Sequence, residues 1–197
     1  MKWRTGSAVA LLALAACATH VPTRYYTLSA ATPPAARAAN AAPAYRVAIG
    51  PVTLPEALDR PQIVLRVAPN RYAISDLERW AEPLKREIPR VIAEDIGQDL
   101  PLVQVAANFQ YGAQDADYRV LIDVLRFEST PGASITLEAA WSVRDRAGTI
   151  LRQARSVHVE KVEGAGIAAL VGAHEKALAA LASEIASALR MVAAKNR

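Results

Sequence analysis

The sequence contains few of the residues that metal sites and disulfide frameworks require. It has one cysteine, Cys17, and three histidines among 197 residues. One thiol cannot form an intramolecular disulfide, and no two of the histidines stand at the spacing of metal ligands. We therefore expect neither a disulfide framework nor a metal centre.

Known catalytic motifs are also absent. The sequence has no G-x-S-x-G nucleophile elbow and no glycine-rich phosphate loop. Adjacent carboxylates such as those of Glu94 and Asp95 are more typical of a solvated helix face than of an acid–base pair. We therefore predict that the protein is not an enzyme, although the members of a Ser–His–Asp triad can be dispersed along a chain.

Strong charge and long apolar runs are missing as well. The sequence has 23 basic and 19 acidic residues, and its arginines are scattered rather than gathered into a stripe. Nucleic-acid binding usually needs a clustered basic surface, so we expect no nucleic-acid partner. After the first sixteen residues we find no run of about 20 apolar residues, the length needed to span a membrane.

The first sixteen residues are typical of an export signal. Lys2 and Arg4 precede an unbroken apolar run, AVALLALAA, at residues 8–16. A short cationic start followed by about 7–15 apolar residues is the pattern of a secretory signal peptide. Residues 1–16 are therefore predicted to be removed, which leaves 21 basic against 19 acidic residues.

The end of this run resembles the lipobox of bacterial lipoproteins, because Leu14, Ala15 and Ala16 precede Cys17. In such precursors the signal peptidase cuts before the cysteine, which is then acylated with fatty acids such as palmitate. Lipidation also accounts for a lone cysteine in an exported protein. We predict that Cys17 carries the lipid, with no other cofactor. Ala18 points, by analogy, to the periplasmic face of the outer membrane.

The remaining chain is predicted to form one folded domain behind a short linker. Residues 17–44 are the lipidated start and an Ala/Pro-rich linker, in which residues 25–28 read as a strand of the main sheet. Whether residues 29–44 are a tether or an insertion in a domain that begins at Tyr25 stays open. Residues 45–197 are long enough for a single core.

Hydrophobic periodicity predicts an α+β fold, with a mixed or antiparallel sheet and two main helices packed on one face. Residues 118–127 are mostly apolar, which suggests a central strand covered on both faces. Pro89 predicts either a kink in the first helix or a helix that begins near residue 89. The predicted strands are 45–52, with a bulge or end at Gly50-Pro51, 62–67, 71–74, 102–106, 118–127, 134–145 and 149–162; the predicted helices begin near residues 83 and 167.

Four segments together resemble the ABC-type transport auxiliary lipoprotein family, which includes the lipoprotein of the paraquat-inducible transport system. The resemblance covers nearly all of the mature chain. Ala57 departs from the bulkier residue of many relatives, and the later strands match only in general pattern. The segments are YYTL (25–28), IGPV (49–52), LPEALDRPQIV (54–64) and RWAEPL (79–84).

The resemblance implies a non-catalytic accessory subunit of an envelope lipid-transport system. Its partners would be an MCE-domain protein that bridges the membranes and the associated ABC transporter or membrane subunits. Such a lipoprotein would dock the bridge at the outer membrane. Self-association into a homo-oligomer stays open, as does the alternative of a direct lipid carrier or envelope-assembly lipoprotein with an apolar groove between sheet and helices.

The proline-fixed loops of the third and fourth segments are the hypothetical docking surface. Trp80 has two readings there: an exposed anchor for a partner, or a plug in the seam between sheet and helix, which we favour. The residues of this predicted surface are Leu54, Pro55, Asp59, Arg60, Gln62, Arg79, Trp80 and Pro83.

Overall fold

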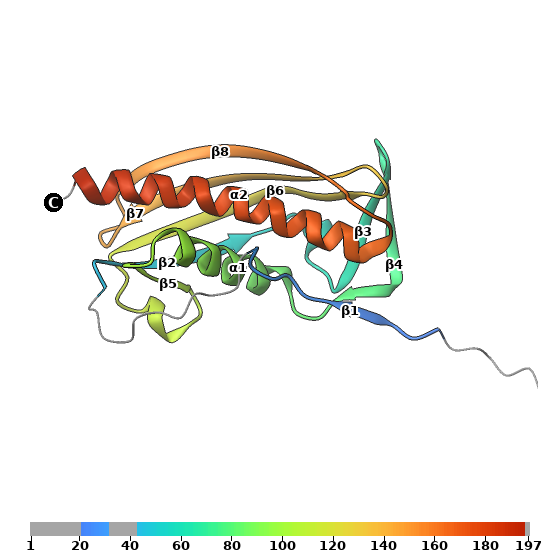
Figure 1. Cartoon of the computed structure of the whole chain (residues 1–197), viewed down its shortest axis with the longest axis horizontal. Helices are drawn as coiled ribbons and strands as arrows, with labels where there is room; N and C mark the ends of the chain where they lie inside the picture. Colours follow the sequence, from blue (N-terminus) through green and yellow to red (C-terminus); the bar gives the residue numbers. More distant parts are fainter. Residues whose placement is uncertain (1–20, 32–42, 196–197) are drawn as a thin grey trace, which may run out of the picture.

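The computed structural model describes residues 21–31 and 43–195. Cys17, the predicted signal peptide and residues 32–42 of the predicted linker lie outside this part of the chain. The described residues form an eight-stranded mixed sheet and two α-helices, which confirms the α+β class (Figure 1). The elements are β1 (Arg24–Tyr26), β2 (Arg46–Thr53), η1 (Glu56–Leu58), β3 (Gln62–Ala68), β4 (Arg71–Trp80), α1 (Leu84–Asp99), β5 (Gln104–Ala107), η2 (Tyr111–Ala113), β6 (Tyr118–Thr130), β7 (Ser134–Asp145), β8 (Ile150–Lys161) and α2 (Gly166–Lys195).

β6 is the central strand of the sheet. On one side it pairs antiparallel with β7 from end to end, and β7 pairs in turn with β8. On the other side, the first half of β6 runs parallel to β2, and its second half meets β3 at Leu65 and Ser129. β5 extends the sheet beyond β2, while β4 and β1 extend it beyond β3.

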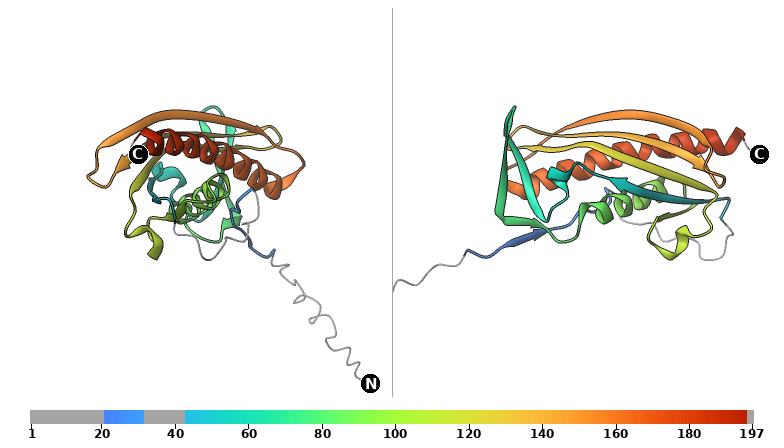
Figure 2. Two further views of the ribbon diagram at one scale, coloured as in Figure 1. Left: turned by 60° about the vertical axis from the view of Figure 1, so that its left-hand side comes forward. Right: turned by 180° about the vertical axis from the view of Figure 1, so that it is seen from behind.

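Both helices cover one face of the sheet, as predicted. Figure 2 shows the long strands arching over α1 and α2. α1 packs against β2, β5 and α2, and α2 packs against β7 and β8. The core between these layers is aliphatic, because both helices place apolar residues at helical spacing toward the sheet. Its fully buried side chains include Ile88, Ile92 and Ile96 of α1, Leu178, Leu181 and Ile185 of α2, and Ile135 and Leu137 of β7.

Within residues 21–31 and 43–195, no helix covers the second face of the β6–β8 region, which corrects the prediction for residues 118–127. Val120 and Ile122 face the helices and are buried, whereas Asp123 is exposed and Leu121 is half-buried. The apolar run in β6 therefore does not mark a strand covered on both faces. We call the uncovered side of β6, β7 and β8 the outer face.

Several boundaries differ from the sequence prediction: β6 ends at Thr130 rather than residue 127, β5 spans Gln104–Ala107 rather than 102–106, and two further differences have a clear cause. β4 extends to Trp80 rather than ending at residue 74, because its second half pairs with β1 as well as β3. α1 begins at Leu84, five residues before Pro89, so the later start is wrong. A proline in the second turn loses one backbone hydrogen bond, and the burial of Ile88 and Ile92 on either side offsets that loss. The register shift between Ile49 and Val52 is the bulge predicted at Gly50-Pro51.

α2 has nearly the predicted bounds, but it is long and apolar enough to depart from our expectation that no mature segment could span a membrane. By length and composition alone it could cross a membrane, and it is the one such helix in the described residues. Its apolar side lies against β7 and β8, however, and Leu170, Leu178 and Leu189 are buried there. A core helix under a sheet accounts for this composition without a membrane.

Candidate functional site

The two proline-fixed loops meet at one corner of the molecule. The Trp80 N–H donates to the Pro61 carbonyl at 2.7 Å, and Gln62 lies opposite Arg79 in the β3–β4 ladder. Lys85 Nζ lies 2.6 Å from Asp59 Oδ2, so the start of α1 is tied to the first loop. We call residues 54–62 and 79–85 the corner. The fold thus joins the two segments that the sequence analysis placed in one surface.

Most of the predicted surface residues reach solvent at the corner. Asp59 and Pro83 are exposed, and Leu54, Pro55 and Gln62 are half-buried. Leu58 and Leu84 instead point into the core and hold the loops down. The corner is therefore a surface whose backbone is fixed by prolines, by ladder pairing and by two buried leucines.

Trp80 is the exception among the predicted residues. Its side chain is 6% exposed and meets the His174 ring at a centroid distance of 6.3 Å, in an edge-to-face arrangement. This confirms the seam reading and corrects the inclusion of Trp80 among partner-contacting residues. Glu78 and Trp80 both turn inward at the end of β4, on alternate positions of the strand. This alternation could not be read from the sequence.

Two arginines at the corner are incompletely bonded. The Nε atoms of Arg60 and Arg79 are buried and have no hydrogen-bond partner among the described residues. A buried donor without an acceptor costs about 1–3 kcal/mol. A carboxylate supplied from outside could pair with these guanidinium groups once they turn outward, because arginine matches a carboxylate with two parallel hydrogen bonds.

A buried Ser–His pair lies beneath the corner. Ser129 Oγ and His174 Nε2 are 2.7 Å apart, which is the distance expected of a nucleophile and its base. His174 Nδ1 has no partner in the described chain, so the carboxylate of a triad is missing there. Burial lowers the pKa of His174 to about 3, so the ring is neutral. The adjoining cavity of about 10 Å³ leaves no space for a substrate, and the pair is a core contact.

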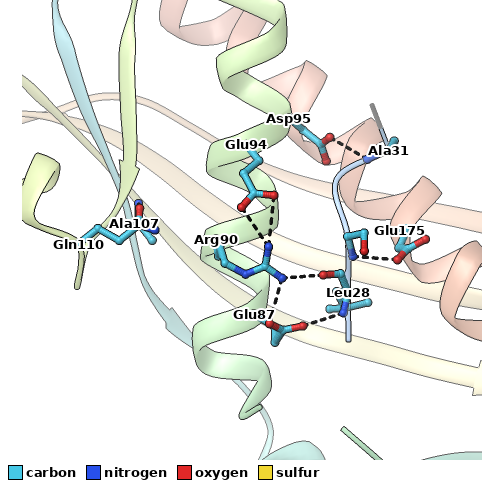
Figure 3. Close-up of polar contacts among 10 residues, drawn as sticks. Leu28, Ala31, Glu87, Arg90, Glu94, Asp95, Ala107, Gln110 and Glu175 are labelled. Carbon is cyan, nitrogen blue, oxygen red and sulfur yellow. Dashed lines mark hydrogen bonds and ion pairs between the residues drawn. The ribbon is translucent and has the colours of Figure 1, made fainter. Parts of the chain in front are cut away.

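A strap that follows β1 lies across the two helices; we use this name for residues 27–31. The Leu28 N–H donates to Glu87 Oε2 at 2.6 Å, and Arg90 Nη2 donates to the Leu28 carbonyl at 2.6 Å (Figure 3). Arg90 also pairs with Glu87 at 3.0 Å, which compensates the buried charge of that carboxylate. The Leu28 side chain is 1% exposed. Both the backbone and the side chain of Leu28 are thus fixed to the body.

Two further carboxylates hold the rest of the strap. Glu175 of α2 accepts the Ser29 N–H at 2.8 Å, and Asp95 of α1 accepts the Ala31 N–H at 3.0 Å. Burial raises the pKa of Asp95 to about 6 and also raises that of Glu175. Sequence reasoning missed this site, since its partners are separated by 59–146 positions in the chain.

Comparison with known proteins agrees with this fold. The family model described as the ABC-type transport auxiliary lipoprotein component matches residues 26–186. One solved structure, an uncharacterised protein, is 16% identical and superposes with a TM-score of 0.71, over 86% of this chain and 99% of its own. A Xanthomonas campestris protein of the DUF330 family is 17% identical, with a TM-score of 0.69 over 88% and 98% of the two chains. No curated protein matches the sequence.

Proposed function

Because the chain belongs to the family of ABC-type transport auxiliary lipoprotein components, we propose that it is a non-catalytic docking subunit of an MCE-type lipid-transport system. In this role it binds an MCE-domain protein, which connects it to the ABC transporter or other membrane subunits. The observation that carries the docking role is the corner, where a fixed backbone presents two arginines whose buried Nε atoms lack acceptors. A partner carboxylate would satisfy these donors.

The proposal places the protein on the periplasmic face of the outer membrane, held by lipid on Cys17. β1 supports a short connection to that membrane. Because Arg24, the first residue of β1, already pairs with β4, only residues 18–23 separate the sheet from the lipid. Seven residue steps span at most about 25 Å when fully extended. The corner would therefore work close to the membrane surface.

The structure gives less support to a direct lipid carrier. That alternative needs an apolar groove between the sheet and the helices, with a volume of several hundred cubic ångströms. Leucine and isoleucine side chains fill the core between the layers in the described residues, and the cavity at His174 is about 10 Å³. A hollow of about 400 Å³ lies beside the start of α2, but charged residues such as Lys161, Glu175 and Lys176 border it, so it is not an apolar groove. Docking is therefore the function that the geometry favours.

The corner can be tested by recovering partners from the envelope. We expect the double variant Arg60→Ala/Arg79→Ala to recover at least tenfold less MCE-domain protein than the wild type in a mild-detergent pull-down read by mass spectrometry. Arg71→Ala is the matched control, because Arg71 is exposed at the far end of the β3–β4 hairpin. Equal recovery by all three folded proteins would show that the corner is not the docking surface.

A further inference from the structure

β8 has an unpaired edge. Among the described residues it pairs with β7 and with no other strand, and it runs along the upper margin of the molecule in Figure 1. Proteins commonly protect such edges by short strands, prolines or bulges. β8 instead has twelve residues and no proline, and its one register shift lies at its start, next to Ile150. Its backbone is therefore open to a further strand.

The ladder shows which backbone groups point outward. The Val162 N–H donates to the Ala133 carbonyl at 3.1 Å. In an antiparallel pair, every second residue bonds to the same neighbour, so the even-numbered residues of β8 from Arg152 onward bond toward β7. The residues between them direct their N–H and C=O groups to the free edge: Gln153, Arg155, Val157, Val159 and Lys161.

The same five residues place their side chains on the outer face. Val157 lies opposite Glu138 and Val159 opposite Thr136, both on the side of β7 that faces away from the helices. The two valines are 55% and 61% exposed. An added strand would therefore find hydrogen-bonding groups at the edge and apolar side chains beside them.

The edge carries excess positive charge. β8 contains Arg152, Arg155 and Lys161 against a single acidic residue, Glu160. On the outer face Arg155 is paired with Glu138, whose other oxygen lies 3.6 Å from Arg126. Arginines thus cover Glu138, because its side chain is buried while that of Arg155 is two-thirds exposed, whereas Asp123 is an exposed carboxylate of this face.

A hollow continues this surface at the start of β8. Its volume is about 660 Å³, and its lining includes Gln153, Arg155 and Ile150 of β8 together with Arg144 and Leu121. Side chains of a strand added at the β8 edge could reach this hollow by passing over Gln153 and Arg155. The hollow supplies both apolar contacts and a second arginine.

From these features we propose that β8 accepts an extended acidic segment of another protein as an additional strand of the sheet. Main-chain hydrogen bonds would hold the segment, and its carboxylates would face the basic residues of β8. A second copy of this chain fits less well, because pairing β8 with β8 would oppose strands that are both positively charged. This surface is distinct from the corner, and the proposal does not depend on the docking role proposed there.

The probe is a fluorescein-labelled peptide of twelve alternating threonine and glutamate residues, with a lysine-for-glutamate peptide as its counterpart. Binding to the full-length lipidated protein in detergent is measured by fluorescence polarisation. We expect the acidic peptide to bind at least tenfold more tightly than the basic one. Its affinity should fall at least fivefold between about 0.05 M and about 0.5 M salt, because charge attraction is screened.

Two substitutions at one position isolate the edge. Val157→Pro removes an N–H that faces the free edge and leaves the β7 ladder intact, whereas Val157→Thr keeps that N–H. We expect at least tenfold weaker binding for V157P and less than a twofold change for V157T. If V157P does not fold, the double variant Arg152→Glu/Lys161→Glu, at two exposed positions of β8, replaces it in the test. We expect this double variant to lose the preference for the acidic peptide.

Four results would overturn the proposal. The first is no preference for the acidic peptide, and the second is equal binding by V157P and V157T. The third is dimerisation in sedimentation velocity that V157P abolishes, since a second copy would then occupy the edge. Binding of the wild type to anionic phosphatidylglycerol vesicles without peptide binding would also count against a polypeptide partner.

Discussion

At the scale of single residues, buried polar groups are what distinguish this protein from a plain sheet-and-helix core. Asp95 has one carboxylate oxygen bonded to the strap and another, Oδ2, that is buried without a partner. Ser129 Oγ bonds to His174 Nε2 inside the core, while His174 Nδ1 has no partner among the described residues. These groups make stability, rather than catalysis, the property that their substitution should change.

Asp95 should make stability depend on pH. Its folded-state pKa, about 6, lies above the ordinary value of 3.8, so the folded state binds the proton more tightly than the unfolded state does. The resulting stabilisation is complete below about pH 4 and is lost as the pH rises through 6. We expect Asp95→Asn to unfold about 2–4 °C above the wild type at pH 8 and no higher at pH 4.

Thermal unfolding at pH 4, 6 and 8 measures this difference. Glu94→Gln is the control, since Glu94 is half-exposed and paired with Arg90. A constant difference between wild type and D95N at all three pH values would contradict the assignment to Asp95.

Ser129→Ala tests the core reading of the Ser–His pair. The substitution leaves His174 Nε2 without its hydrogen-bond partner in a buried site. We expect the free energy of unfolding to fall by about 1–3 kcal/mol in a urea titration. The folded variant should recover as much partner from the envelope as the wild type does. If it recovered less partner while still folded, the Ser129–His174 pair would have a functional role rather than a structural one.

At the scale of elements, the strap links the predicted lipid site to the helices. Its attachments are one buried leucine side chain and backbone hydrogen bonds to three carboxylates. Segments with few attachments open locally before the whole protein unfolds. The strap should therefore detach when its leucine is truncated, even though the sheet stays folded.

Leu28→Ala provides this test. Removing a buried leucine side chain costs about 2–5 kcal/mol of stability. The few backbone hydrogen bonds of the strap do not compensate for a loss of this size. We expect faster amide exchange at Leu28, Ser29 and Ala31 and faster trypsin cleavage after Arg24, with exchange in β7 unchanged. Val21→Ala, at an exposed valine, is the control. Protection equal to that of the wild type would show that Leu28 does not hold the strap.

At the scale of the whole molecule, the described residues form one main core, and the predicted lipid site lies before the first of them. Among the described residues, the first buried side chain is that of Leu28, eleven positions after Cys17. Attachment to the membrane and folding of the body should therefore be separable.

Cys17→Ala should release the protein from the membrane without changing its stability. We expect the variant in the soluble envelope fraction, with an unfolding temperature within about 1 °C of the mature wild type, because the buried core of the described residues begins at Leu28. Fractionation and calorimetry measure the two properties. Continued membrane association of C17A would contradict lipid attachment at this residue.

Much of the fold was predictable where neighbouring residues determine the structure. The Gly148 turn and the flanking β-prone runs set the bounds of β7, which are those predicted, and the apolar spacing of α2 located that helix to within a residue or two. The two loops of the corner were also identified, because prolines restrict the backbone locally. Local propensity and periodicity depend on residues that are neighbours in the chain, so the sequence alone is enough to predict their effect.

Contacts between distant residues decided the rest. The burial of Trp80, the second half of β4 and the strap depend on partners from other elements, up to 146 positions away. The free edge of β8 likewise follows from which strands the fold places beside it. Such features arise from packing and chain topology, and no short stretch of sequence encodes which distant surface will cover a side chain or leave an edge unpaired.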